Sequence, residues 1–151
     1  MTKKLIIVFS FFLIFASIDL QAQNLDPVKI ESSTSVSGDT LTIMVEFSIE
    51  ENWMVYDSLG GEVGPIPISF DHNAILNLEF ISIKKPKTKH KYDDIFEVDL
   101  WYFTNKASYE LSYIITDSNL PYLGVVSLEF MSCNLKNGVC LPPKLVDIPV
   151  K

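Results

Sequence analysis

The sequence predicts an all-β protein, an immunoglobulin-like antiparallel β-sandwich. Three observations lead to this class. Apolar side chains recur at every second residue in several runs, clusters of Gly, Pro, Asn and Asp separate these runs, and no stretch has the 3.6-residue period of an amphipathic helix. About seven to nine short strands are expected, and strands with turn signals at this spacing are typical of a sandwich. The 151 residues show no repeat, linker or second domain.

The expected strands follow from the alternation. The clearest is 40–49, TLTIMVEFSI, which places five apolar side chains on one face: Leu41, Ile43, Val45, Phe47 and Ile49. The next expected strands are rich in aromatic and β-branched residues, and they span 77–83, 96–103, 109–116 and 124–132. A last strand is expected around Val146, Ile148 and Val150. Turn clusters separate them at 37–39, 59–61, 64–65, 117–121 and 137–138.

The N-terminal segment has the three parts of a secretory signal peptide. Lys3 and Lys4 precede an apolar run over 5–18, and Ala22 offers a small residue at a cleavage point before Gln23. The run is short for a membrane span. We expect a signal peptide over 1–22 and an exported domain over 23–151 that does not insert into the membrane after cleavage. An uncleaved single-span anchor is the alternative.

Composition excludes several classes of function. The chain has 19 acidic residues against 12 lysines, no Arg, and a net charge of −7. Because phosphate contacts need clustered Lys and Arg, a nucleic-acid partner is not expected. Two cysteines cannot complete a four-ligand zinc site, and we expect no metal and no cofactor. The two histidines, His72 and His90, are expected to be isolated surface residues in loops.

A run of five lysines within 84–91 is followed at once by acidic residues. We interpret it as a solvated loop whose charges are locally balanced. A basic patch for an anionic partner is the alternative.

The most informative segment is 130–143, FMSCNLKNGVCLPP. Cys133 is expected to end one strand and Cys140 to begin the next, and a hairpin of this kind can bring the two sulfurs together. Because Leu128 and Phe130 are expected to face the core, Cys133 would face the other way. The pair can be a structural staple, worth about 2.5 kcal/mol in the chain-entropy model. It can equally be a site of thiol–disulfide exchange, which needs an accessible sulfur. Spacing alone leaves both open.

This segment resembles the signature at the end of the N-terminal domain of the thiol:disulfide interchange protein DsbD, in which a Cys-loop-Cys motif is followed by Pro-Pro. Three upstream segments agree with that family in order: NWMVY at 52–56, GGEVGPIPISF at 60–70 and YDDIF at 92–96. The resemblance covers about 26–151. Departures are a six-residue loop between the cysteines, Asn52 where the family has Gly, and the insertion 62–63.

The resemblance implies an immunoglobulin-like periplasmic domain that relays reducing equivalents as a thiol:disulfide oxidoreductase. Its redox couple would be Cys133 and Cys140. The implied partners are a membrane electron donor of the DsbD type and thioredoxin-fold proteins, such as disulfide isomerases and cytochrome c maturation factors. This sequence carries no transmembrane electron channel and no thioredoxin domain, so we expect the donor to be another protein.

The resemblance also implies roles for single residues. Cys140 would form mixed disulfides and Cys133 would resolve them. Phe96, with Ile95, would belong to a loop that covers the pair, and Tyr56 would flank it. Asp93 and Asp94 would lie near the sulfurs, where a carboxylate disfavours the thiolate. As alternatives, the two aromatic residues can be core or rim residues and the two acids solvated turn residues.

Two other functions stay open. One is an exported immunoglobulin-like binding module whose disulfide is only structural. The other is a scaffold that docks a thioredoxin-like partner without turnover.

Overall fold

Eleven β-strands make up the regular structure of the described chain, more than the seven to nine that were predicted. The computed structural model describes residues 26–151, so the predicted signal peptide lies outside the described residues. The strands are β1 (Val28–Ser37), β2 (Thr40–Ile49), β3 (Trp53–Leu59), β4 (Ser69–Leu76), β5 (Leu78–Lys84), β6 (Lys89–Asp93), β7 (Val98–Phe103), β8 (Lys106–Ile115), β9 (Leu123–Phe130), β10 (Ser132–Asn134) and β11 (Lys144–Val150). Residues 26–151 contain no helix with the length and hydrophobicity of a membrane crossing.

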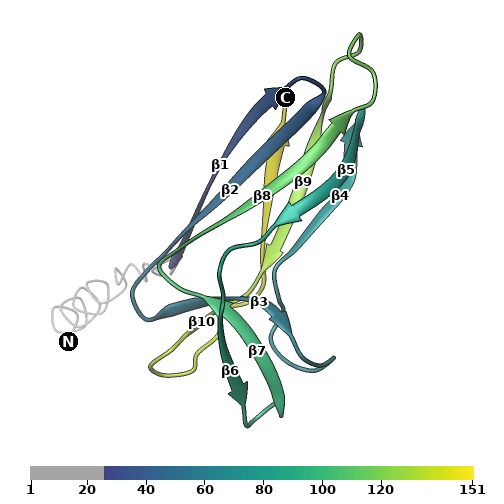
Figure 1. Cartoon of the computed structure of the whole chain (residues 1–151). Helices are drawn as coiled ribbons and strands as arrows, with labels where there is room; N and C mark the ends of the chain where they lie inside the picture. The colour runs from purple at the N-terminus through teal and green to yellow at the C-terminus, as the bar shows by residue number, and fades with distance from the viewer. Residues whose placement is uncertain (1–25) are drawn as a thin grey trace, which may run out of the picture.

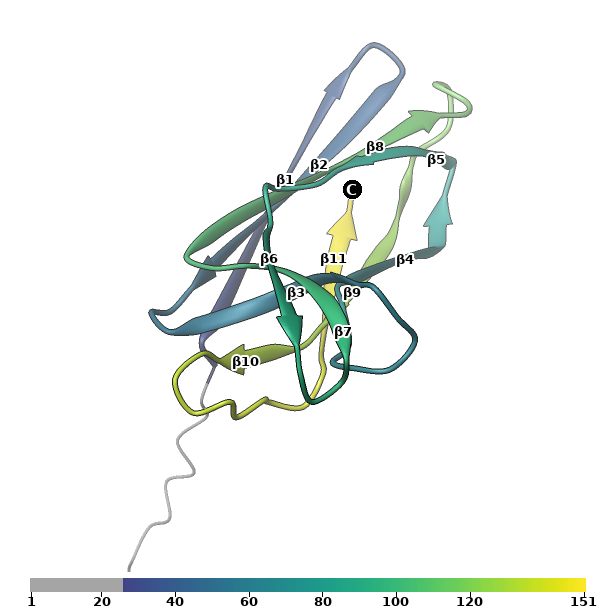
Figure 2. The same ribbon diagram turned by 60° about the horizontal axis from the view of Figure 1, so that its bottom comes forward.

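The strands pair antiparallel in three sheets, which confirms the predicted fold class. Sheet 1 has the order β1-β2-β8-β5, sheet 2 the order β10-β3-β7-β6, and sheet 3 the order β11-β9-β4. Sheets 1 and 3 form the long body of the molecule, and sheet 2 lies across one end of it (Figure 1). A view turned by 60° brings this end forward and shows β10, β3, β7 and β6 as a separate layer (Figure 2).

The main core lies between sheets 1 and 3 and extends to one face of sheet 2. The predicted strand 40–49 is β2, and its five inward side chains are at most 7% exposed. Phe47 is central, because its ring meets those of Phe103, Tyr109 and Phe130 edge-on, with centroids 5.4 to 5.8 Å apart. Edge-on aromatic pairs stabilise a core beyond the area that they bury.

Sheet 2 is buried on both faces along β3. Trp53 and Val55 point into the main core. Met54 and Tyr56 point the other way, into a smaller group that also contains Leu100 and Cys133. We call these four residues the second cluster. The two faces of one short strand therefore belong to two different cores.

Most predicted strands have somewhat different bounds in the structure, such as 109–116, which is β8 over Lys106–Ile115, and two of the differences bear on the site. The strand predicted over 96–103 begins only at Val98, because the side chain of Asp93 accepts hydrogen bonds from the backbone N–H of Ile95 and Phe96, each at 3.1 Å, and so holds a turn there. The strand predicted over 124–132 is divided at Met131 into β9 and β10.

The interpretation of the lysine run as a loop is wrong over its second half, which forms β6 and pairs with β7. The predicted balance by the acidic residues that follow the run holds for Lys91 and Asp93, whereas the other lysine contacts are with residues farther away in the chain. Four of the lysines reach separate partners: Lys84 to Glu110 at 3.6 Å, Lys85 to Asp57 at 3.2 Å, Lys89 to Thr104 at 2.9 Å and Lys91 to Asp93 at 4.0 Å. The run is thus not a patch of free cations.

Two features shape sheet 3. Gly124 has φ +150°, and a Cβ there would lie 2.2 Å from the carbonyl oxygen of Ala74, so only glycine lets β9 approach β4 this closely. At the other edge, Pro149 lies in β11, opposite Val125 of β9.

Candidate functional site

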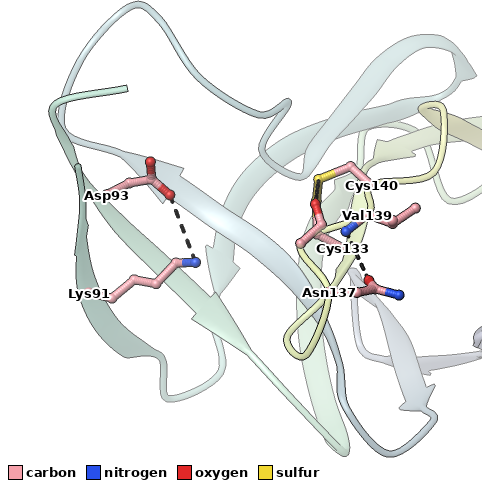
Figure 3. Close-up of a disulfide and its surroundings, with 7 residues drawn as sticks. Lys91, Asp93, Cys133, Asn137, Val139 and Cys140 are labelled. Atoms are coloured by element: carbon pink, nitrogen blue, oxygen red, sulfur yellow. Dashed lines mark hydrogen bonds and ion pairs between the residues drawn. A yellow bond between two sulfur atoms is a disulfide. The ribbon is translucent and has the colours of Figure 1, made fainter. Parts of the chain in front are cut away.

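A tight hairpin loop brings the two cysteines together. The side-chain oxygen of Asn134 accepts hydrogen bonds from the backbone N–H of Lys136 at 2.9 Å and of Asn137 at 3.3 Å. Gly138 then turns the chain back with φ +70°, and its N–H donates to the carbonyl of Asn134 at 2.9 Å. Asn and Gly are the residues that tolerate such turns. Cys133 and Cys140 consequently lie opposite each other and form a disulfide (Figure 3).

The two sulfur-bearing residues have very different environments. Cys133 is 1% exposed and belongs to the second cluster, where it lies opposite Met54 of β3. Cys140 is exposed. Cys133 faces away from the main core, as predicted, but it reaches a second apolar group rather than solvent. A thiolate arriving from solution therefore has access to the disulfide from the side of Cys140.

One face of sheet 2 connects the disulfide to the acidic turn. Residues that pair across neighbouring strands share a face, as do alternate residues along a strand. Starting from β10, this face carries Cys133, then Met54 and Tyr56, then Leu100 and Tyr102, and finally Lys91 and Asp93. We call it the disulfide face. The Lys91–Asp93 pair and the disulfide lie at its opposite edges (Figure 3).

The structure places the other predicted site residues along this face. Tyr56 lies in the second cluster with Cys133. Asp93 is on the same face but three strands from Cys133, roughly 14 Å measured along the sheet at the usual strand spacing. Asp94 and Phe96 lie in the turn after β6, where the Phe96 residue is 42% exposed and its neighbour Ile95 is 87% exposed. Tyr56 is therefore close to the sulfurs, whereas the acids and Phe96 lie toward the far edge.

Tyr56 stays protonated at neutral pH. Burial raises its pKa to about 12, with further contributions from the charge of Asp93 and from Tyr102. The ammonium of Lys91 lies 6.0 Å from the centre of the Tyr56 ring and 5.7 Å from that of Tyr102. This position is within the range of cation–π attraction.

A buried carboxylate beside the site was not predicted. Asp57 is 7% exposed and follows Tyr56 at a bulge in β3. Its oxygens accept hydrogen bonds from the hydroxyls of Tyr109 and, at 3.0 Å, Ser58, and from Lys85 Nζ at 3.2 Å. Burial and this hydrogen bond raise the pKa of Tyr109. The only signal in the sequence is a single acid at the end of the apolar run WMVY.

His72 and His90 were predicted to lie in loops, and this is wrong because both lie on strands. His72 is half-buried on β4; its Nδ1 lies 2.7 Å from the Tyr113 hydroxyl and its ring stacks on Phe80 with centroids 4.3 Å apart. Burial lowers the pKa of His72. His90 is exposed on β6, with Nε2 2.6 Å from Oδ1 of Asp99. Within residues 26–151, no group of three or more His, Cys, Asp or Glu side chains is arranged to hold a metal ion.

One departure from the resemblance has a structural reason. Asn52, which stands where the family pattern has Gly, has φ +66°. Asn is the residue besides Gly that most readily adopts this conformation. The turn into β3 is therefore compatible with either residue.

No family model matches the sequence, and no curated protein matches it. Among solved structures, the chain is similar to the N-terminal periplasmic domain of ScsB from Proteus mirabilis, with a TM-score of 0.54 and 16% identity. The match covers 86% of this chain and 47% of that chain, so this chain spans about half the length of that one. The reduced N-terminal domain of DsbD from Neisseria meningitidis matches with a TM-score of 0.49 and 16% identity, over 80% of this chain and 83% of that one. The likeness to the ScsB domain is one of fold, and it agrees with the fold that the resemblance implied.

Proposed function

We propose that Cys133 and Cys140 are the redox couple of an exported thiol–disulfide exchange domain. The observation that carries the proposal is the unequal burial of the pair: Cys140 is exposed, whereas Cys133 is 1% exposed. A disulfide that works in exchange needs one accessible sulfur and one that is protected from competing thiols. The shared fold with the periplasmic domain of ScsB supports the proposal and favours a periplasmic location.

The exchange begins at Cys140. A thiolate of the partner attacks Cys140 Sγ, and the bond between the two cysteine sulfurs breaks. The electron pair of that bond goes to Cys133 Sγ, which takes up a proton and becomes a thiol. The partner is now joined to Cys140 through a mixed disulfide.

A second thiolate of the partner completes the transfer. It attacks the partner's own sulfur in the mixed disulfide and releases Cys140, which is protonated. The partner leaves with a disulfide. The domain is left with two thiols, and their formation accounts for the two electrons that the partner has given up. The same steps in reverse reduce a client: Cys140 attacks the client disulfide and Cys133 resolves the product. Because Cys133 is held beside Cys140, resolution is intramolecular and has a high effective concentration.

The proposed partners are thioredoxin-fold redox proteins and a membrane electron donor of the DsbD type. Two exposed apolar side chains, Leu135 and Val139, lie on the loop that carries Cys140. They provide apolar contact area beside the reactive sulfur, as expected of a surface that meets another protein. Client proteins that mature cytochrome c belong to the same proposed class.

The flanking residues have proposed roles that follow from their places on the disulfide face. Tyr56 packs beside Cys133 and keeps water from the buried sulfur. Asp93 holds the turn that presents Phe96, and we propose that this turn shields the disulfide face when no partner is bound. Asp93 and Asp94 belong to the same turn, and we propose that they disfavour the thiolate only when this turn covers the pair, because a carboxylate acts on a thiol over about 4–6 Å.

The reduction potential of the couple tests the proposal. Purified protein is equilibrated in thiol buffers of graded potential, and the reduced fraction is read by alkylation and mass. A value above roughly −300 mV is expected, since couples used in exchange lie between about −270 and −120 mV. A value below roughly −300 mV indicates a structural disulfide. That result would favour the exported immunoglobulin-like binding module instead.

Two single variants form a matched pair for finding partners. Cys133→Ala leaves the exposed Cys140, which is expected to accumulate mixed disulfides because no internal thiol resolves them. Cys140→Ala leaves the buried Cys133, which is expected to capture far less. Equal capture by both variants would contradict the assigned roles. A partner that binds a variant lacking both cysteines as well as the parent would indicate a scaffold without turnover.

A further inference from the structure

A groove opens between the edges of sheets 1 and 3, away from the disulfide face. It lies where β4 and β5, the edge strands of the two sheets, run apart (Figure 2), and it encloses about 250 Å³. Tyr109 and Ile68 are buried at its base. Its walls are apolar and largely aromatic: Phe70 and His72 on the β4 side, and Phe80 and Ile83 on the β5 side. Small-molecule sites are typically apolar hollows of this kind with a few placed polar groups.

Lys85 supplies the charged group of this groove. Its Nζ donates to Oδ2 of Asp57 at 3.2 Å, and Asp57 also accepts hydrogen bonds from Tyr109 and Ser58. An ammonium has three N–H donors, and the bond to Asp57 uses one of them. The buried carboxylate therefore fixes the position of the ammonium and leaves donors for a further acceptor.

The other polar groups of the groove also favour an acceptor. The Nδ1 of His72 is engaged with the Tyr113 hydroxyl, and burial keeps the ring neutral at neutral pH. When Nδ1 accepts from Tyr113, Nε2 carries the proton and donates. The hydroxyl of Ser69, which also lines the groove, can donate as well. A ligand that satisfies these groups needs an acceptor at one end and an apolar body at the other.

We propose that this groove binds a small carboxylic acid with an aromatic or branched apolar body. The carboxylate accepts from Lys85 and the body lies between Phe70 and Phe80. Because Asp57 offsets the charge of Lys85, selectivity comes from a charge-assisted hydrogen bond at short range rather than from long-range attraction. The inference does not depend on the redox function.

The test compares two probes that differ only in the acceptor. The protein expressed from its full sequence is titrated with 3-phenylpropanoate and with 3-phenylpropan-1-ol, and binding is followed by calorimetry and by NMR shifts of the groove residues. The acid is expected to bind about tenfold more tightly than the alcohol, the ratio for one charge-assisted hydrogen bond. Equal affinities would overturn the proposal, as would the absence of shifts in Phe70, Phe80 and Ile83.

Variants separate the two halves of the site. The double variant Asp57→Asn with Lys85→Met removes the cation without leaving an unpaired buried charge, and it is expected to lower the affinity for the acid to that for the alcohol. Ile83→Trp fills the groove and is expected to abolish binding of both probes. Lys89→Met, which removes a lysine bound to Thr104 outside the groove, is the control and leaves both affinities unchanged. Binding that survives Ile83→Trp, or that falls equally in the control, would contradict the proposed site.

Discussion

The two faces of β3 divide the molecule into a large core and a small one. On one face, Trp53 and Val55 enter the main core, a continuous group of 18 buried residues between sheets 1 and 3. On the other, Met54 and Tyr56 enter the second cluster, which has four buried residues and includes Cys133. The main core is enclosed by residues of all three sheets. The second cluster is bordered by partly buried side chains and by a disulfide with one exposed end.

The difference shows where stability and chemistry reside. Buried apolar area is the main source of stability, and most of it lies in the main core. The second cluster buries less, yet it holds the sulfur that the proposed exchange must protect. We therefore expect substitutions in the main core to change the free energy of unfolding most, and substitutions in the second cluster to change the behaviour of the disulfide most.

The largest expected effect comes from Phe47→Ala set against Met54→Ala. Phe47 contacts three aromatic rings, and its loss is expected to cost about 3–5 kcal/mol of unfolding free energy. Met54 belongs to the smaller cluster, whose surrounding side chains are only partly buried, and we expect about 2 kcal/mol. Denaturant unfolding measures both. The rate at which a small thiol reduces the disulfide is expected to rise in Met54→Ala more than in Phe47→Ala under native conditions. The reverse order would show that the two faces are not separable.

The next largest effect is a difference in stability between Cys133→Ser and Cys140→Ser. Each of Cys133→Ser and Cys140→Ser opens the ring and is expected to cost about 2.5 kcal/mol. Cys133→Ser also places a hydroxyl among apolar side chains, which adds about 1–3 kcal/mol. Unfolding of both variants is compared with the oxidised parent, which gives the cost of opening the ring, and with the reduced parent, which gives the cost of the hydroxyl. Equal stabilities would mean that the Cys133 site tolerates a polar group.

A smaller effect, on the main-core side, depends on pH. Burial lowers the pKa of His72 below its ordinary value of 6.5. As the pH decreases, the unfolded chain therefore takes up this proton at a higher pH than the folded chain does. The free energy of unfolding is therefore not reduced by this group above about pH 6.5, and it decreases as the pH falls below that value. His72→Gln is expected to flatten this part of the profile, which denaturant unfolding at graded pH measures. An unchanged profile in His72→Gln would assign the pH dependence to other groups.

The smallest expected effect is that of Tyr56→Phe. The hydroxyl contributes little to packing, and we expect the unfolding free energy to change by less than about 0.5 kcal/mol. The ultraviolet titration of the phenols is expected to lose a step at about pH 12. Because the ring that covers Cys133 is retained, the proposed shielding role predicts an unchanged rate of disulfide reduction in this variant. Faster reduction would show that the hydroxyl, and not the ring, protects the disulfide.

The sequence predicted best where one pattern determined the structure. The alternation in 40–49 predicted β2 and its buried face correctly, because a strand with one apolar face has only one register that buries it. The same reasoning missed β1, β3, β4 and β6. Three of them, β1, β4 and β6, are edge strands, so their pairing depends on neighbours in the sheet. The fourth, β3, is buried on both faces and therefore shows no alternation.

The site was predictable in part for the same reason. The spacing of Cys133 and Cys140 predicted that they can meet, which depends only on a local hairpin. The roles of Asp57, Lys85 and His72 were not visible, because their partners lie between 28 and 52 residues away in the chain. Contacts across two sheets leave no periodic trace in a single sequence.

Pro149 has a consequence for how separate copies of the protein behave. A proline has no backbone N–H, and in β11 it interrupts the row of donors and acceptors at the outer edge of sheet 3. The outer edge of sheet 2 is formed by β6, which carries Lys89 and Lys91. Proline and lysine on edge strands hinder the addition of a strand from another molecule. These two edges are therefore poor templates for cross-β growth, even though the regular structure of residues 26–151 consists of strands.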